Sequence, residues 1–282
     1  MSRRRDLLGV VPFFVFVGIF LIIPTLVVAI GSFLGTDNRV TFDNVTALAD
    51  GYIVQAFIRS ILLSAVTAIL GAVIGALLGY AVVTAGPDST VRRVVTSACG
   101  VLAQFGGVTL AFAFMATIGL SGFVTLFLRD SLGVDIFAGG VWLFDLPGLV
   151  LVYTYFQIPL MVIVFLPALD GIRPQWREAT ESLGGSTWYY WRHVAGPLLA
   201  PAFLGSTLLL FANAFSAYAT AAALVSQGSP IVPLQIRSAL TSEVLLGREN
   251  IGKAMALGMV VVVAVVMSLY AALQRRTSRW LD

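Results

Sequence analysis

The sequence predicts an all-α, polytopic membrane protein with six transmembrane helices. Of its 282 residues, 59% are hydrophobic and only 11% are charged, whereas soluble domains carry about 25% charged residues. The mean hydropathy of +0.95 also excludes a disordered chain, which needs low hydrophobicity and high charge. The single Cys99 and the single His193 leave no internal disulfide and almost no ligands for a transition metal. We therefore expect no cofactor in this chain.

Six stretches without charged side chains are each long enough to cross a hydrocarbon core of about 30 Å as a helix. We expect one transmembrane domain, 1–282, with helices near 8–32, 57–84, 94–119, 147–169, 199–226 and 253–274. The third and fifth uncharged stretches exceed one span. Their surplus predicts interfacial segments near 120–128, 193–198 and 227–236.

The first span follows Arg3, Arg4 and Arg5, a pattern that also begins cleaved signal peptides. Signal peptides have an apolar region of about 7–15 residues. The uncharged run from Leu7 to Thr36 is about twice as long. This length favours a retained first helix.

The second span carries Gly71, Gly75 and Gly79 at four-residue spacing. Small residues at this spacing let two membrane helices approach closely. We interpret these glycines as packing positions.

The later spans contain polar but uncharged side chains. They are Gln104 in the third span, Thr154 and Gln157 in the fourth, and Asn213, Ser216, Tyr218 and Thr220 in the fifth. In one helix, Asn213, Ser216 and Thr220 would share a face. Such a face could line a polar path, or it could join helices through hydrogen bonds. We predict a translocation path for the set, with Asn213 and Ser216 as its main residues.

The distribution of charge predicts the orientation of the chain, because basic residues are retained on the cytoplasmic side. With the N-terminus inside, the cytoplasmic segments hold 11 of the 17 basic residues and a net charge of +5. The outer segments hold six basic and eight acidic residues, a net charge of −2. Both termini are therefore expected in the cytoplasm. The basic residues lie at helix ends, where membrane topology explains them, so we expect no nucleic-acid partner.

The long cytoplasmic loop, 170–198, is patterned as two short helices at a bend. Pro174 suits the first turn of a helix, and Gly184 suits a C-terminal stop with positive φ. Ser186 could cap a second short helix, which we expect to end at Gly196-Pro197. Glu178 and Glu181 lie on one side of the first helix, and Ala179 and Leu183 form an apolar face.

The loop reads Glu178-Ala179-Thr180, three residues, Gly184, nine residues, then Val194-Ala195-Gly196-Pro197. In this spacing it resembles the EAA signature of permease subunits of binding-protein-dependent ABC importers, E-A-A, three residues, G, nine residues, I-x-L-P. The sequence departs at Thr180, Val194 and Gly196. The wider chain is similar to the type I permeases of the polyamine, phosphonate, ferric iron and thiamine group.

This resemblance implies a loop that docks into a groove on an ATPase subunit. The residues expected to carry the coupling are Glu178, Ala179, Glu181, Leu183, Gly184 and Pro197. The resemblance also implies an ABC ATPase dimer that binds ATP and Mg²⁺, a second and similar permease subunit, an extracytoplasmic binding protein, and a bacterial inner membrane location. The alternative is that the loop has only a structural role, as a hairpin that links two spans.

Two rivals remain open. No Asp, Glu, Lys or Arg falls in the middle of a predicted span, although ion-coupled carriers place such groups there. This lack favours an energy source in another subunit, and an ion-coupled secondary transporter is the alternative. A membrane-embedded enzyme is disfavoured by the scarcity of His and acidic residues in the spans. The chain has no GxxxxGK[ST] phosphate loop, so ATP hydrolysis is expected in another subunit.

Overall fold

The computed structural model describes residues 11–35, 37, 39–225, 231–241 and 249–278. Within these residues the regular secondary structure is helical, and one isolated antiparallel bridge joins Leu34 and Val40. Six of the described helical stretches are long and apolar enough to cross a membrane: Val11–Gly31, Gly51–Thr84, Gly107–Leu132, Leu146–Asp170, Thr187–Ser216 and Glu249–Ala272. The predicted all-α class with six spans is confirmed. Arg3, Arg4 and Arg5 lie outside the described residues.

The chain divides into two compact units. The first joins Met1–Ile58 with Ile231–Val262, and the second joins Arg59–Pro230 with Val263–Asp282. Helices α4 (Gly51–Thr84) and α14 (Glu249–Ser278) begin in the first unit and continue into the second.

The first unit contains α2 (Ile23–Gly31), α3 (Asp43–Thr46) and α13 (Val232–Thr241). Side-chain amides hold the turn after its first span. Asn44 donates to the carbonyl oxygens of Ser32 (3.2 Å) and Leu34 (2.8 Å), and Asn250 also donates to Leu34 (2.8 Å). Beneath this turn, Ile53 and Val232 belong to a buried apolar cluster.

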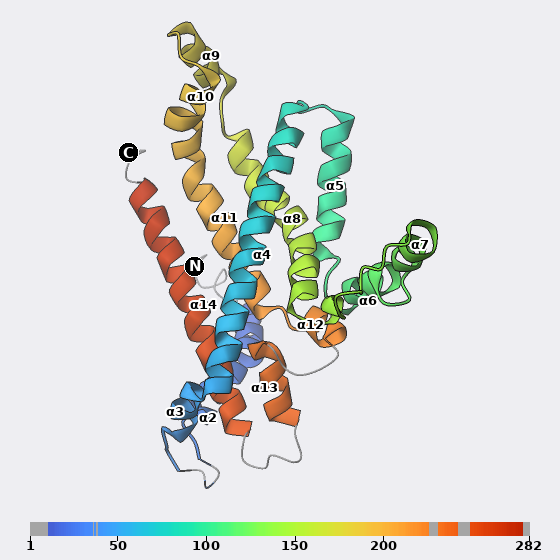
Figure 1. The fold of residues 1–282 in the computed structure, drawn as a ribbon. Coiled ribbons are helices and arrows are strands. Elements are labelled where there is room, and N and C mark those ends of the chain that lie inside the picture. The colour runs from blue at the N-terminus through green and yellow to red at the C-terminus, as the bar shows by residue number, and fades with distance from the viewer. Residues whose placement is uncertain (1–10, 36, 38, 226–230, 242–248, 279–282) are drawn as a thin grey trace, which may run out of the picture. The chain divides into compact units, whose positions relative to one another are not determined.

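The second unit is built around α8 (Leu146–Asp170), which packs against α4, α5 (Thr90–Gln104) and α11 (Gly196–Ser216) (Figure 1). Its core combines residues of three of these helices: Ala68 and Ala72 of α4, Met161, Phe165 and Leu169 of α8, and Leu199 and Leu210 of α11. Helix α8 therefore forms the centre of the unit.

The glycines of α4 face α8 directly. A Cβ atom at Gly71 would collide with Gln157, and one at Gly75 would lie 2.5 Å from the Cβ of Met161. A Cβ at Gly79 would approach Leu169 to 3.2 Å. The packing interpretation of these glycines is confirmed, because no larger residue fits at the first two positions.

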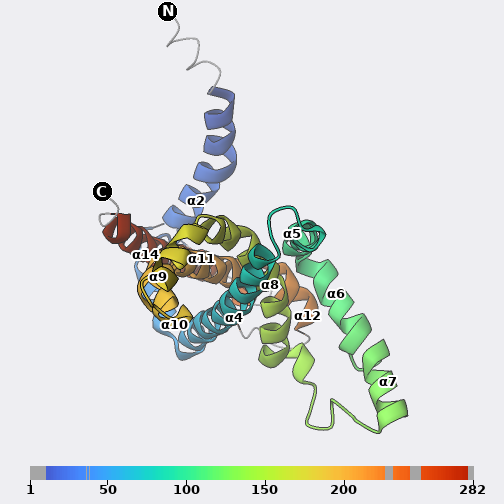
Figure 2. The ribbon, with the colours of Figure 1, turned by 90° about the horizontal axis from the view of Figure 1, so that it is seen from above.

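The third predicted span, 94–119, is not one helix. Helix α5 ends at Gln104, and α6 (Gly107–Ile118) begins after an interruption at Phe105 and Gly106. Gly107 has φ of +67°, which a continuous helix of L residues avoids. Helices α6 and α7 (Phe123–Leu132) then run outward from α8 (Figure 2). The segment predicted as interfacial near 120–128 lies within the candidate span Gly107–Leu132, and most of it belongs to α7.

The fifth predicted span, 199–226, differs at its C-terminal end. Helix α11 stops at Ser216, Ala217 is extended with φ −70° and ψ 109°, and the short α12 spans Ala219–Leu224. Thr220 therefore lies on a different helix from Asn213 and Ser216. The expectation that these three residues share one helix face is wrong.

The same span also begins earlier than predicted. Helix α10 (Thr187–Tyr190) runs through a π-helical turn, Trp191–Ala195, directly into α11. Gly196-Pro197 does not end a helix, and no separate interfacial segment exists at 193–198. Pro197 lacks an N–H group, and its ring would crowd the carbonyl of residue 193 in a regular turn. The wider π turn accommodates it. Part of the segment predicted at 227–236 lies outside the described residues.

Candidate functional site

The loop 170–198, which we predict to couple to an ATPase, begins with helix α9 (Pro174–Ser182), whose ends match the sequence pattern. Pro174 occupies the first turn, and Gly184 follows the helix with φ of +77°. The hydroxyl of Ser186 then accepts a hydrogen bond from the Tyr189 N–H (3.2 Å) and caps α10. The predicted bend between two short helices is therefore present, with α9 and α10 at one end of the second unit (Figure 1).

Most residues expected to carry the coupling lie on the surface of this loop. Glu178, Ala179 and Glu181 are exposed, and the side chain of Leu183 is 89% exposed. Thr180 instead points inward, where its hydroxyl donates to the Trp176 carbonyl oxygen (2.8 Å). The departure from Ala at this position therefore does not change the exposed surface.

The two acidic residues of α9 differ in their partners. Glu181 pairs with Arg177 through a 2.9 Å contact between Oε1 and Nε. This hydrogen bond raises the pKa of the Arg177 guanidinium above its ordinary value. Glu178 has no ion-pair partner among the residues described. Of the two, Glu178 is the carboxylate free to meet a partner molecule.

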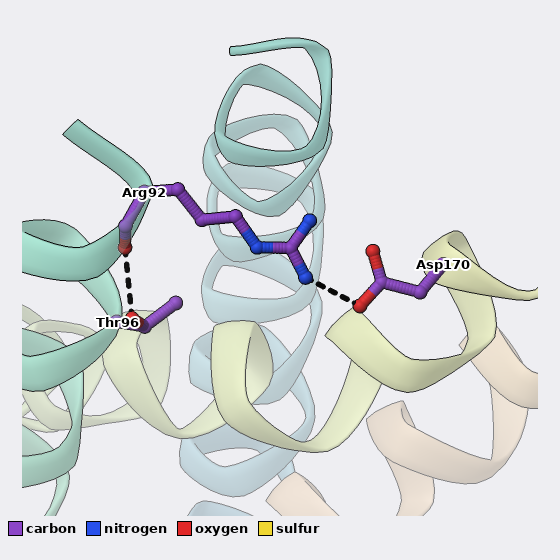
Figure 3. Close-up of polar contacts among 3 residues, drawn as sticks. All are labelled: Arg92, Thr96 and Asp170. Carbon is purple, nitrogen blue, oxygen red and sulfur yellow. Dashed lines mark hydrogen bonds and ion pairs between the residues drawn. The ribbon is translucent and has the colours of Figure 1, made fainter. Parts of the chain in front are cut away.

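The base of the loop is joined to α5 by an ion pair that the sequence analysis did not foresee. Asp170, the last residue of α8, lies 2.6 Å from Nη2 of Arg92 in the first turn of α5 (Figure 3). The Thr96 hydroxyl donates to the Arg92 carbonyl oxygen (2.8 Å). These residues are 78 positions apart, so no local pattern could reveal the pair. It places the α4–α5 turn and the coupling loop at the same end of the unit.

Pro197 is the one predicted coupling residue that lies outside the bend. It is exposed in the first turn of α11, after the π turn. The neighbouring Gly196 N–H donates to the Trp191 carbonyl oxygen, and a Cβ atom at Gly196 would lie 2.5 Å from that oxygen. The glycine that departs from the EAA pattern is thus required by the π turn.

Two of the predicted path residues donate hydrogen bonds to backbone carbonyl oxygens, although the buried Oε1 of Gln157 has no partner among the residues described. The amide of Gln157 is fully buried and donates to the Leu210 carbonyl oxygen of α11 (2.8 Å). The Thr154 hydroxyl donates to Val150 on its own helix (2.7 Å). Neither residue lines the cavity described next, and the exposed Gln104 does not line it either.

The remaining path residues meet at a cavity of roughly 270 Å³, where both helix interruptions come together. It is lined by Ala103, Gly106, Gly107, Phe156, Asn213, Ser216, Ala217, Tyr218, Ala219 and Thr220. None of these side chains is ionisable at neutral pH. Tyr153 supports the wall, because its buried hydroxyl donates to the Ala217 carbonyl oxygen (2.6 Å). Gly106 and Gly107 were missed as site residues, although the Gly-Gly pair signals a helix break.

The chain is similar in sequence to permease proteins of transport systems. No protein-family model matches it. It is 26% identical over 198 residues to the putative ferric transport system permease protein FbpB 1 of Haemophilus influenzae, which is 68% of this chain and 30% of that protein. It is 26% identical over 119 residues to the molybdenum transport system permease protein ModB of Escherichia coli K12, 42% of this chain and 49% of that one. The chain spans less than a third of the length of the ferric relative.

Solved structures share the fold over nearly the whole chain. A chain of a bacterial ABC transporter involved in the import of alginate, an acidic polysaccharide, superposes with a TM-score of 0.78 at 17% identity. The match covers 98% of this chain and 97% of that chain. A chain of the MetNI methionine ABC transporter gives a TM-score of 0.56 at 16% identity, covering 79% and 95%. At such identities the likeness concerns the fold.

Proposed function

We propose that this chain, an ABC importer permease by sequence similarity and by fold, passes a small polar solute across the bacterial inner membrane into the cytoplasm. The solute would be delivered by an extracytoplasmic binding protein, and separate ATPase subunits would supply the energy. The observation that carries the proposal is the bend at Gly184, which presents Glu178, Ala179 and Leu183 on an exposed surface.

The exposure of Leu183 supports a docking role for the loop. Burying a leucine side chain contributes about 1.5–3 kcal/mol, and this one is 89% exposed at the end of a short helix. A groove on an ATPase subunit would cover Leu183, while the unpaired carboxylate of Glu178 makes a polar contact at its edge. Ala179 is small enough to allow close approach of the two surfaces.

A second permease subunit completes the proposed complex. One chain offers one coupling loop, whereas an ATPase dimer presents two docking grooves. The partner would be a similar chain, and ATP and Mg²⁺ would bind to the ATPases. The permease chain would itself perform no chemistry.

The cavity between the broken helices is the proposed part of the solute path. Membrane proteins tolerate non-helical backbone at membrane depth where it lines a cavity or is buried in protein. The interruptions at Gly106 and Ala217 fit this rule, since both border the cavity. Asn213, Ser216, Tyr218 and Thr220 supply hydrogen-bonding groups there without a fixed charge that would hold a solute too tightly.

The test is uptake by proteoliposomes that contain the chain with its partner permease and ATPase, supplied with loaded binding protein. We expect uptake to require ATP inside the vesicles and to persist when ion gradients are dissipated. Uptake that continues without ATP and stops with the ion gradient would instead establish a secondary transporter.

A pair of charge reversals tests the docking surface in the same assay. Glu178→Arg should abolish uptake and release the ATPase from the complex, because it places a cation in the groove. Asp88→Arg makes the same change at an exposed position of the α4–α5 turn, and should leave both unchanged. Equal behaviour of the two variants would remove α9 from the docking surface.

A further inference from the structure

We infer that the cavity between α5, α6, α11 and α12 binds a small oxyanion, or the oxyanionic part of a larger solute. The inference rests on the proposed function and deepens it by naming the class of solute. Three features carry it: free donors at the start of α6, acceptors already engaged at the ends of α5 and α11, and the hydroxyl of the buried Thr220, which has no partner among the residues described.

The first feature is the N-terminus of α6, a helix of 12 residues. Its first N–H groups have no partner within the helix, and no side chain caps them at Gly106. Gly106 and Gly107 both line the cavity. The positive end of a helix dipole with free N–H groups favours an anion.

The second feature is the state of the carbonyl groups that would attract a cation. At the end of α11, the Ser216 hydroxyl donates to the carbonyl oxygens of Ala212 (2.9 Å) and Asn213 (3.2 Å). The Ala217 N–H donates to Ala214, and the Tyr153 hydroxyl donates to Ala217. These acceptors are thus already engaged by the protein.

The end of α5 shows the same arrangement. The Phe105 N–H donates to the carbonyl oxygens of Val101 and Leu102, and the Gly106 N–H donates to that of Gln104. No carboxylate is among the lining residues, so the cavity presents no fixed negative charge to a ligand.

The third feature is Thr220, which is 2% exposed and lines the cavity. Its hydroxyl forms no hydrogen bond with the residues described and is open to the cavity, where a ligand could accept from it. The exposed side-chain amide of Asn213, on the opposite side of the break, also lines the cavity. Both groups can donate to an oxygen atom placed between α11 and α12.

The volume of the cavity and the absence of charged side chains in its lining also fit a small oxyanion. Roughly 270 Å³ is below the range of about 300–1,000 Å³ typical of pockets for larger ligands. A small tetrahedral ion fits this volume. It would be held by partial charges alone, so binding would be weak enough for release.

Equilibrium dialysis of the full chain in lipid nanodiscs tests the inference, with phosphate, sulfate and molybdate as anionic probes. Spermidine, thiamine and glucose are the cationic and neutral probes. We expect at least one oxyanion to bind at least tenfold more tightly than the other three probes. Binding of spermidine, thiamine or glucose as tightly as any oxyanion, or binding of no probe, would overturn the inference.

Variants locate the site. Thr220→Val removes the unpaired hydroxyl at nearly constant volume and should weaken oxyanion binding about tenfold. Asn213→Asp introduces a negative charge and should abolish oxyanion binding; a gain of spermidine binding with oxyanion binding retained would contradict the assignment. Thr207→Val is the matched control, because the Thr207 hydroxyl donates to the Phe203 carbonyl oxygen of its own helix (2.8 Å), outside the cavity.

Should Thr220→Val fail to fold, Thr220→Ser keeps the hydroxyl and should retain binding, whereas Thr220→Ala should lose it. Equal effects of the Thr207 and Thr220 substitutions would remove the site from the cavity. ATPase activity stimulated by loaded binding protein is measured in parallel. If stimulation is normal while no oxyanion binds, the inference fails and the proposed function stands.

Discussion

Gly184 and Gly196 are required for different physical reasons. A Cβ atom at Gly184 would meet no atom within 4 Å, so only its φ of +77° constrains the residue. Gly196 has ordinary helical dihedrals, with φ −60° and ψ −55°, but a Cβ there would strike the Trp191 carbonyl oxygen. Gly184 is required by its positive φ, whereas Gly196 is required by the close approach of the Trp191 carbonyl oxygen. Substitutions can separate the two.

At Gly184, the backbone rather than the space should decide the outcome. Gly184→Val should strain the bend by about 1–2 kcal/mol and uncouple ATP hydrolysis from uptake. Gly184→Asn should retain coupling, since Asn tolerates the left-handed region. The ratio of solute transported to ATP hydrolysed measures this effect. Equal ratios for the two variants would contradict the conformational argument.

At Gly196, the close approach of the Trp191 carbonyl oxygen should determine the effect of a substitution on stability. Gly196→Ala should destabilise the chain by about 1–3 kcal/mol, as overpacking does, and thermal unfolding in nanodiscs would detect it. Gly100→Ala is the control, because Gly100 lies in α5 with nothing within 4 Å of its Cβ position. That change should be neutral or stabilising by about 0.5–1 kcal/mol. A Gly196→Ala variant as stable as the control would remove the need for glycine in the π turn.

At the level of helices, the sequence predicts where apolar stretches lie better than where they break. The interruption before Gly107 has a visible signal in the Gly-Gly pair. The one at Ala217 has none, because Ala-Tyr-Ala is compatible with a helix; it depends on Tyr153, 64 residues away, which binds the freed carbonyl. At Pro197 the error was the opposite one. The sequence predicted a helix end there, but the helix continues into α11 after the π turn.

The candidate site likewise contains features with a local sequence signal and features that depend on residues distant in the sequence. The bend at Gly184 and its cap at Ser186 are local, so their residues could be named from spacing alone. The cavity depends on two breaks that meet in space. Asn213 and Ser216 could therefore be proposed from polarity, whereas the contribution of Gly106 and Gly107 could not.

The ion pair between Arg92 and Asp170 should matter for coupling because it fixes the end of α8 at the base of the loop. Arg92→Glu should lower the transport rate several-fold while the complex stays assembled, and the exchange Arg92→Glu with Asp170→Arg should restore it. Arg93→Glu, on an exposed neighbour, is the control. Failure of the exchange to restore transport, with normal assembly, would show that the pair itself is not what matters.

For the whole molecule, the charge balance and the ion pair make one prediction of orientation. In a Cys99→Ala background, a cysteine at Ser186 should react only with thiol reagents that enter the cytoplasm, because Ser186 lies in the coupling loop. A cysteine at Asp43 should react with impermeant reagents from outside. Both positions are exposed, so accessibility within the chain does not limit the labelling. The reverse pattern would overturn the orientation and the assignment of the coupling loop.

Helix α8 contacts both proposed functional features of the second unit: Tyr153 supports the cavity wall, and Asp170 lies at the base of the proposed coupling loop. These two residues are 17 positions apart, which corresponds to about 25 Å along one helix. If docking of an ATPase changes the affinity of the cavity for its solute, thermodynamic linkage requires the solute to change the affinity of docking by the same factor. An occupied cavity would then be sensed at the ATPase groove, so futile ATP hydrolysis in the absence of solute could be restrained from within this chain.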